Sequence, residues 1–298
     1  MDNLIYWQKI ADITIMDGNF YEYKGKNMKI KKIKEENIEI IPKNEIHKLR
    51  EKENNYCICI PIINEGERLK KELQRAIDNG VTDIADIILI DSGTTDDSIS
   101  PENLKKYRIN TLIEMEEKRK YTQSKALIAG FHYALECGYK GIITIDGNNK
   151  DSIEDVKKFV EKLEEGYDYI QGSRFIDGGQ AINTPKSREF AIKYIHARMI
   201  SSICKKKYTD TTNLFRGYSR KYLMHEKVKP FRPIFKSYEI STYLSTRADQ
   251  LGLKTLEIPV TRAYPDGKKY STKVGKIKGN YLLIKSLMED KLGMYNVK

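Results

Sequence analysis

The feature that most constrains the fold is an alternation of short apolar runs with amphipathic segments, which begins at Tyr56. The runs are rich in β-branched and aliphatic residues, as buried strands are: YCICIPI, IADIILID, GIITID and YDYIQGSRF. The segments between them carry apolar residues at helical spacing: RLKKELQRAIDNG, SKALIAGFHYALECG and SIEDVKKFVEKLEEG. Strands that alternate with helices predict an α/β fold, in which a mostly parallel, doubly wound sheet is flanked by helices.

Polar residues follow each of the predicted strands. In a sheet of this kind, ligands bind beyond the carboxyl ends of the strands. These ends are marked by Asn64–Glu65, Asp91–Ser92, Asp146–Asn148 and Gly172–Arg174. Because the ends of parallel strands meet at one edge, we predict a binding site there.

The chain divides into three parts at changes in this pattern. Residues 1–55 are polar and rich in lysine; MKIKKIKEENIEII predicts short strands or a hairpin, and NEIHKLREKENN predicts a charged linker. We therefore expect a small β-rich extension and linker over 1–55, one half of the α/β domain over 56–176, and the other half over 177–298.

Charge and cysteine content restrict the partners and the setting. A net charge of +11 favours a polyanion, which is nucleic acid, an anionic membrane surface or a phosphorylated small molecule. No zinc-finger, RNP-type or helix-turn-helix pattern is present, so nucleic acid is not expected. Four cysteines without a CxxC pair indicate a reduced, cytoplasmic setting. No apolar run of about 18 residues occurs, but the basic amphipathic segment 186–207 predicts peripheral contact with the inner face of a membrane.

Six motifs in order resemble the family 2 glycosyltransferases with the GT-A fold, and within them the dolichyl-phosphate mannose synthase-like branch. They are IPIINEGERL, ILIDSGTTDDS, SKALIAGFHYA, IITIDGNNKDS, QGSRF and YTDTTNLFRGYSR, and the resemblance extends from Tyr56 to about Arg262. It implies an enzyme that transfers a sugar from a nucleotide diphosphate with inversion. The acceptor would be a glycan, a glycolipid or a polyprenyl phosphate, in the synthesis of cell-surface polysaccharide. Residues 56–176 would then bind the nucleotide sugar, and residues 177–298 the acceptor.

The resemblance places the donor nucleotide on the first two strand ends and on the helix before GIITID. The residues assigned to it are Pro61, Asn64, Glu65, Asp91, Ser92 and Lys125. Ser92 stands where many relatives have a second aspartate, and this departure leaves the identity of the base open.

The DxD motif, which holds a divalent ion in the family, reads Asp146–Gly147–Asn148 in this chain. Asn148 can ligate Mg²⁺ or Mn²⁺ through its carbonyl oxygen but brings no charge, and Lys150 stands where some relatives have a neutral ligand. An ammonium cannot coordinate a metal, but it can neutralise phosphate directly. Two explanations follow: a weakened metal site centred on Asp146, which recruits Asp151, or a site where Lys150 performs part of the ion's task. The first is preferred because Asp146 would otherwise have no evident role.

Further residues are assigned to the leaving diphosphate and to the acceptor. The basic side chains are Lys150, Arg174, Arg188, Arg262, Lys268, Lys269 and Lys273. A hydroxyl acceptor needs a carboxylate that takes its proton. Glu239 and Asp210 are the candidates for this base, and Asp146 is the third residue assigned to catalysis. Asp210 is also expected to hold its loop through Thr212. A phosphate acceptor needs no base.

Two other functions compete with glycosyl transfer. A nucleotidyltransferase would need a glycine-rich loop with a basic residue after the first strand, where this chain has only Gly66 in an acidic neighbourhood. A catalytically silent nucleotide- or glycan-binding module would explain the altered DxD motif. Asp91, Arg174 and Glu239 favour an enzyme, because a binder has no need of an acid on the acceptor side.

Overall fold

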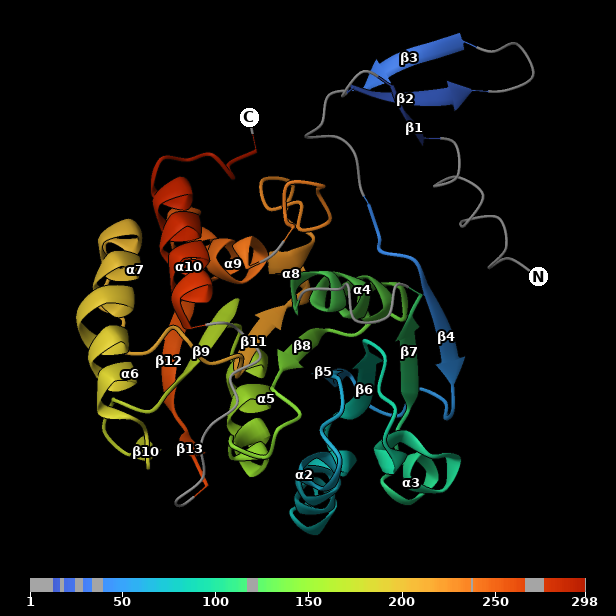
Figure 1. Cartoon of the computed structure of the whole chain (residues 1–298), viewed down its shortest axis with the longest axis vertical. Helices are drawn as coiled ribbons and strands as arrows, with labels where there is room; N and C mark the ends of the chain where they lie inside the picture. Colours follow the sequence, from blue (N-terminus) through green and yellow to red (C-terminus); the bar gives the residue numbers. More distant parts are fainter. Residues whose placement is uncertain are drawn as a thin grey trace.

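The computed structural model describes the backbone of residues 13–16, 19–24, 29–33, 40–116, 123–236, 238–265 and 276–297. Side chains are described for residues 40–116, 123–236, 238–265 and 281–297. The predicted α/β fold with a mostly parallel sheet is confirmed (Figure 1).

The central sheet has the strand order β12-β9-β11-β8-β5-β6-β7-β4. The strands are β4 (Asn44–Lys48), β5 (Tyr56–Ile62), β6 (Asp86–Asp91), β7 (Thr111–Met115), β8 (Gly141–Thr144), β9 (Tyr169–Ser173), β11 (Arg216–Ser219) and β12 (Thr255–Pro259). β8, β5, β6 and β7 run parallel, as do β9 and β12. β4 and β11 run antiparallel to their neighbours.

Helices cover both faces of this sheet (Figure 1). They are α2 (Glu67–Asp78), α3 (Pro101–Lys106), α4 (Gln123–Glu136), α5 (Val156–Glu164), α6 (Lys186–Ala191), the π-helical η5 (Ile192–His196), α7 (Ala197–Cys204), α8 (Arg220–Leu223), α9 (Glu239–Gln250) and α10 (Lys276–Lys291). Short 3₁₀ turns are η2 (Val81–Asp83), η3 (Asp97–Ile99) and η4 (Ile153–Asp155).

The strand β5 explains why its sequence is a continuous apolar run. Cys57 and Cys59 pack into the core under α4 and α9, whereas Ile58 and Ile60 pack into the core under α2 and α5. Successive side chains of a strand point to opposite faces, so a strand that is covered on both faces must be apolar at every position.

The reversed strand β11 brings a second loop to the edge where the parallel strands end. Arg216, its first residue, lies opposite Thr144 at the end of β8 and opposite Gln171 in β9. The loop that precedes β11 therefore lies beside the residues that follow β8 and β9. In the same region β13 (Thr261–Ala263) pairs with β10 (Gln180–Ile182), and an isolated bridge joins Asp151 to Arg262.

The N-terminal part is rich in strands, as predicted. β1 (Ile13–Met16), β2 (Asn19–Lys24) and β3 (Lys29–Ile33) form an antiparallel sheet. The prediction of a charged linker over NEIHKLREKENN was wrong in its first half, because Asn44–Lys48 form β4 against β7. The reason is physical: β4 is an edge strand with mostly solvent-facing side chains, and charged residues are common on such edges.

Two further predictions concern the basic loop and the absence of a membrane-spanning segment. The basic loop that contains Lys268, Lys269 and Lys273 lies outside the described residues. Among the residues that are described, none of the helices has both the length and the apolar character needed to cross a membrane.

Candidate active site at the strand ends

The ends of β5 and β6 lie side by side and are held together by the predicted donor residues. The Ser92 backbone N–H donates to the carbonyl oxygen of Ile62 at 3.0 Å. The buried Asp91 carboxylate accepts the backbone N–H groups of Gly93 and Thr94 at 3.1 and 2.8 Å. These bonds give Asp91 a clear role in shaping the loop, and its carboxylate oxygens keep further lone pairs for a ligand.

The remaining donor candidates surround this loop. Asn64 has a left-handed backbone (φ 50°), and its Oδ1 accepts the Thr95 backbone N–H at 2.8 Å. Glu65 is buried and pairs with Arg68 at 2.8 Å. Pro61 lies within β5 opposite Ile90. Thus Pro61, Asn64, Glu65, Asp91 and Ser92 are brought together at one edge.

Lys125 comes from another element. It lies in the first turn of α4, in which Gln123 donates through Nε2 to Asp146 Oδ1 at 3.3 Å. The start of α4 therefore lies beside Asp146.

The turn that carries Asp146 and Lys150 is fixed from below by α2. The Asn149 backbone, at φ 56°, donates its N–H to Glu72 Oε2 at 2.7 Å, and Arg75 donates to Asn149 Oδ1 at 3.0 Å. Burial, together with the charges of Asp151 and Asp146, holds the pKa of Glu72 well above its ordinary value. Gly147 packs so closely on β5 that an added Cβ would lie 2.8 Å from Ile62 Cγ2.

Arg262, from β13, lies between the two carboxylates of this turn. Its Nη2 donates to Asp146 Oδ2 at 3.0 Å, and its Nη1 donates to Asp151 Oδ2. The Arg262 side chain is 6% exposed. Burial alone would lower its pKa, but Asp151 and then Asp146 outweigh burial and raise the pKa well above the ordinary value. Arg262 is therefore a permanent buried cation at the strand ends.

Three cationic groups gather around the ring of Tyr264. Lys150 Nζ lies 5.1 Å from the ring centroid, and the guanidinium carbons of Arg188 and Arg262 lie at 5.8 and 5.9 Å. Burial would raise the pKa of Tyr264, but Arg262, Arg188 and Arg174 together lower it. The pKa of Lys150 is lowered by burial and then by Arg262. We call Lys150, Arg188, Arg262 and Tyr264 the cationic cluster; it is an arrangement that binds anions.

Arg174 and Asp210 form a second buried unit behind this cluster. Arg174 Nε donates to Asp210 Oδ2 at 2.6 Å and Nη2 donates to Oδ1 at 2.9 Å, with side chains only 1% and 0% exposed. The predicted bond to Thr212 is present, because its backbone N–H donates to Asp210 Oδ1 at 3.3 Å. Since these donors use its oxygens, Asp210 has the geometry of a group that positions the loop.

Glu239 is connected to the site through the backbone. It is the first residue of α9, and Arg216 donates to the carbonyl oxygens of Ser241 and Thr211 at 2.7 and 2.9 Å. Arg216 thereby joins the start of α9 to the loop of Asp210.

Two residues of the site were not anticipated. Glu257 accepts the backbone N–H groups of Thr209 and Asp210, each at 3.0 Å, and holds that loop from β12. Tyr264 is the aromatic ring around which the three cations lie. A signal for Tyr264 was available, because residues two apart in a strand share a face and Tyr264 follows Arg262 at that spacing.

The side chains at Asp146 do not fit a divalent ion as they stand. Mg²⁺ and Mn²⁺ require several oxygen ligands, with carboxylates supplying the charge. In the part of the chain with described side chains, no group of three His, Cys, Asp or Glu residues is placed to hold a metal. Asp146 Oδ2 and Asp151 Oδ2 both accept from Arg262 instead, and Asp151 Oδ1 is buried without a hydrogen-bond partner among the described residues. Asn148 Oδ1, which is buried without a hydrogen-bond partner among the described residues, offers one neutral oxygen.

Comparisons with known proteins identify the family of the chain. A model of the family described as "Glycosyl transferase family 2" matches residues 57–226. An undecaprenyl-phosphate 4-deoxy-4-formamido-L-arabinose transferase from Proteus mirabilis is 28% identical over 247 residues, which are 81% of this chain and 68% of that protein. The polyprenol monophosphomannose synthase of Mycolicibacterium smegmatis is 25% identical over 207 residues, which are 68% of this chain and 76% of that protein. The chain spans about two thirds of the length of the arabinose transferases.

A solved structure supports the fold. Glucosyl-3-phosphoglycerate synthase from Mycobacterium tuberculosis, in complex with Mn²⁺, UDP and phosphoglyceric acid, aligns with a TM-score of 0.53 and 14% identity. The alignment covers 80% of this chain and 78% of that one. At this identity the likeness concerns the fold alone.

Proposed function

The chain belongs to glycosyl transferase family 2, and from this premise we propose that it transfers a sugar, with inversion, from a nucleoside diphosphate to a polyprenyl phosphate. The observation that carries the proposal is the cationic cluster beside Asp146, at the edge where β5, β6 and β8 end. A diphosphate that leaves a sugar gathers negative charge as the bond breaks, and buried cations at that point stabilise the transition state.

The reaction assigns a role to each group of residues. Asn64, Asp91 and Ser92 face the nucleoside, and the cationic cluster faces the diphosphate. An oxygen of the acceptor phosphate attacks the anomeric carbon from the side opposite the diphosphate, and the bond between that carbon and the β-phosphate oxygen breaks with its electron pair on the oxygen. Because the attacking phosphate is already an anion, no proton has to be removed. The relatives named above act, by their names, on undecaprenyl phosphate and polyprenol, which favours this acceptor.

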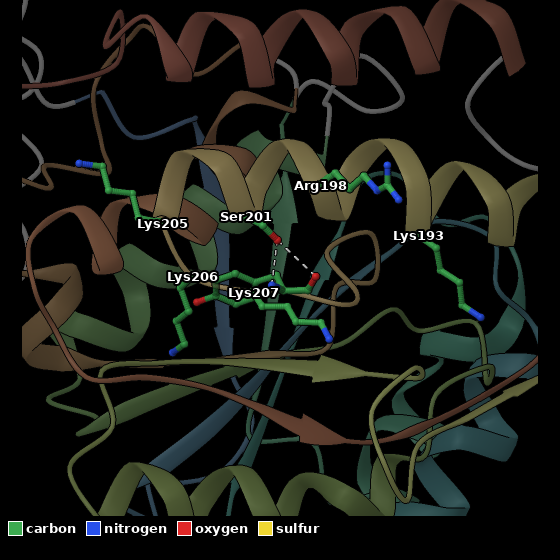
Figure 2. Close-up of a pocket in the computed structure, with 7 residues that line it drawn as sticks. Lys193, Arg198, Ser201, Lys205, Lys206 and Lys207 are labelled. Carbon is green, nitrogen blue, oxygen red and sulfur yellow. Dashed lines mark hydrogen bonds between the residues drawn. The ribbon is translucent and has the colours of Figure 1, made fainter.

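A basic hollow beside α7 supports an anionic acceptor. The hollow, of about 500 Å³, is lined by Lys193, Arg198, Ser201, Lys205, Lys206, Lys207 and Tyr208 (Figure 2). It borders the site through Phe175, since Lys193 Nζ lies 4.5 Å and the Arg174 guanidinium carbon 5.3 Å from the centroid of that ring. The hollow therefore supplies further positive charge next to the site.

The same side of the molecule supports contact with an anionic membrane. Phe190 and Tyr194, on consecutive turns of α6 and η5, are 59% and 52% exposed, and their ring centroids lie 4.9 Å apart. α10 lies next to α7 (Figure 1) and exposes Tyr281 and Met288, and Leu292 directly after it is also exposed. Exposed aromatic and aliphatic side chains beside lysines are typical of surfaces that enter the headgroup region. We propose that this contact is peripheral, at the inner face of the membrane.

The proposal is tested by transfer assays with a panel of UDP-, GDP- and CDP-linked sugars and undecaprenyl phosphate in anionic vesicles. We expect release of the nucleoside diphosphate and appearance of a labelled lipid. Binding of nucleotides without turnover would favour a silent binding module instead. Transfer to a glycan hydroxyl but not to the lipid phosphate would overturn the acceptor class and would return Glu239 to the role of base.

The membrane contact has its own test. Phe190→Ser with Tyr194→Ser should reduce co-sedimentation with anionic vesicles but leave the nucleotide affinity in solution unchanged. Equal sedimentation of the variant and the parent protein would contradict the contact.

A further inference from the structure

We propose that Arg262 and Lys150 take the place of the divalent ion, so that this enzyme binds and releases its nucleoside diphosphate without a metal. The inference rests on the proposed function, because it concerns the leaving group of that reaction. It assigns the cation requirement to two side chains of the protein itself.

The first argument is the position of Arg262. A metal ion in a DxD site is held by carboxylates and faces the diphosphate. In this chain, the two carboxylates of the turn, Asp146 and Asp151, converge on the guanidinium of Arg262. The distance from Arg262 Nη2 to Asp146 Oδ2 is 3.0 Å. The backbone bridge between Asp151 and Arg262 positions the guanidinium next to the turn. The guanidinium thus occupies the point between the carboxylates where an ion would have to lie.

The second argument is the charge that this site already contains. Lys150, Arg188 and Arg262 bring three positive charges around Tyr264, and the two aspartates bring two negative ones. A surplus of one positive charge remains among these groups before any ligand enters. A diphosphate therefore meets a positive potential without an added ion.

The third argument is competition for Asp146. An ion that ligated this carboxylate would lie beside a guanidinium that is almost fully buried and paired with both aspartates, so the two cations would compete for the same negative charge. A buried cation whose pairing is weakened is destabilised, and this penalty weakens ion binding. Asn148, the other residue of the motif, offers only a neutral oxygen in return. The pairing of both aspartates with Arg262 thus stabilises the guanidinium and weakens the binding of an ion.

The two cations differ in what they can do for the leaving group. Arg262 is held rigidly by two carboxylates and supplies a fixed charge with its remaining N–H groups. Lys150 is only half-buried, and an ammonium on a flexible stem can follow the oxygen that separates from the sugar. Charge-assisted hydrogen bonds are about twice as strong as neutral ones. The bonds from both cations to the leaving oxygen therefore strengthen as negative charge develops on that oxygen.

Nucleotide affinity separates this inference from metal-dependent binding. The full chain is titrated with UDP, GDP, CDP and ADP by isothermal calorimetry, once in excess EDTA and once with Mn²⁺ or Mg²⁺. For the nucleotide that binds best, we expect the two dissociation constants to agree within about twofold, which corresponds to a negligible free-energy difference.

Variants then assign the cation function to its residues. Lys150→Gln should weaken binding in EDTA by about tenfold or more and should make it respond to Mn²⁺. Arg262→Gln should do the same, with a larger response to Mn²⁺, because Asp146 and Asp151 become free to bind the ion. Lys157→Gln, which removes an exposed lysine from α5, is the matched control and should change neither value.

Each result bears on the inference. A loss of about tenfold or more for the parent protein in EDTA would overturn it while leaving the glycosyltransferase function in place. Unchanged affinity of Lys150→Gln in EDTA would also overturn it, and this half-buried position decides the matter if Arg262→Gln does not fold. If no nucleotide binds with or without metal, the proposed function itself fails and the inference falls with it.

Discussion

The pair Arg174–Asp210 gives a sharp test of the site's electrostatics. In Asp210→Asn the side chain keeps its size but loses the charge, and its amide N–H₂ group meets the N–H donors of Arg174. Removal of one partner from a buried ion pair costs about 3–5 kcal/mol. With both side chains almost completely buried, no water compensates. For a chain of this length, roughly 2 °C per kcal/mol predicts that Tm falls by about 6–10 °C, which scanning calorimetry measures directly.

Two controls isolate burial as the cause. Asp97→Asn breaks an ion pair of nearly the same length, 2.7 Å to Lys70, but the Asp97 side chain is 72% exposed. Exposed pairs contribute little, so we expect no resolvable change in Tm. Arg174→Met with Asp210→Leu removes both charges and should recover most of the loss, because an apolar pair of similar volume replaces a buried ion pair well. The reasoning is refuted if Asp210→Asn melts together with Asp97→Asn, or if the double variant is as unstable as the single one.

Three further predictions concern the turn after β8 and the acceptor side. Since burial and Arg262 lower the pKa of Lys150, its positive charge is lost at a lower pH than that of an ordinary lysine. Nucleotide affinity should therefore fall as the pH rises through that pKa. In calorimetric titrations, Lys150→Arg should retain its affinity to higher pH. Gly147→Ala would bring a Cβ to 2.8 Å from Ile62 and should destabilise the fold by about 1–3 kcal/mol. An unchanged urea midpoint would contradict this and would show that Ile62 in β5 moves aside without a cost in stability. Glu239→Gln should slow transfer to a hydroxyl acceptor by about 10²–10⁴-fold without loss of donor affinity, whereas undiminished transfer to a phosphate acceptor would show that no base is used.

The fold was predictable because its strands are covered on both faces. Cys57 to Ile60 alternate between two cores, and this double burial produces the continuous apolar runs that are legible in the sequence. The meeting of Asn64, Asp91 and Asp146 at one edge then follows from parallel topology alone. β4 escaped prediction because an edge strand carries no such apolar requirement.

The partners of the charged side chains could not be predicted. Arg262 and Asp151 are 111 residues apart in the chain, and their contact depends on how β13 lies against the turn after β8. Sequence identifies Arg262 as basic and Asp146 as acidic, but it gives no information on whether an acid faces an ion or a guanidinium. The metal at Asp146 was preferred because that carboxylate otherwise had no evident role, and its bond to Arg262 supplies such a role.

The antiparallel β11 has a consequence for how the molecule assembles. It lies between β8 and β9. Within the sheet, β9, the last strand of the 56–176 half, is therefore hydrogen-bonded to the rest of that half through β11, a strand that is synthesised later. A fragment that ends at residue 176 would leave the facing edges of β8 and β9 exposed and prone to aggregation. The two halves should therefore unfold in a single cooperative transition, and neither should be recoverable as an autonomous domain.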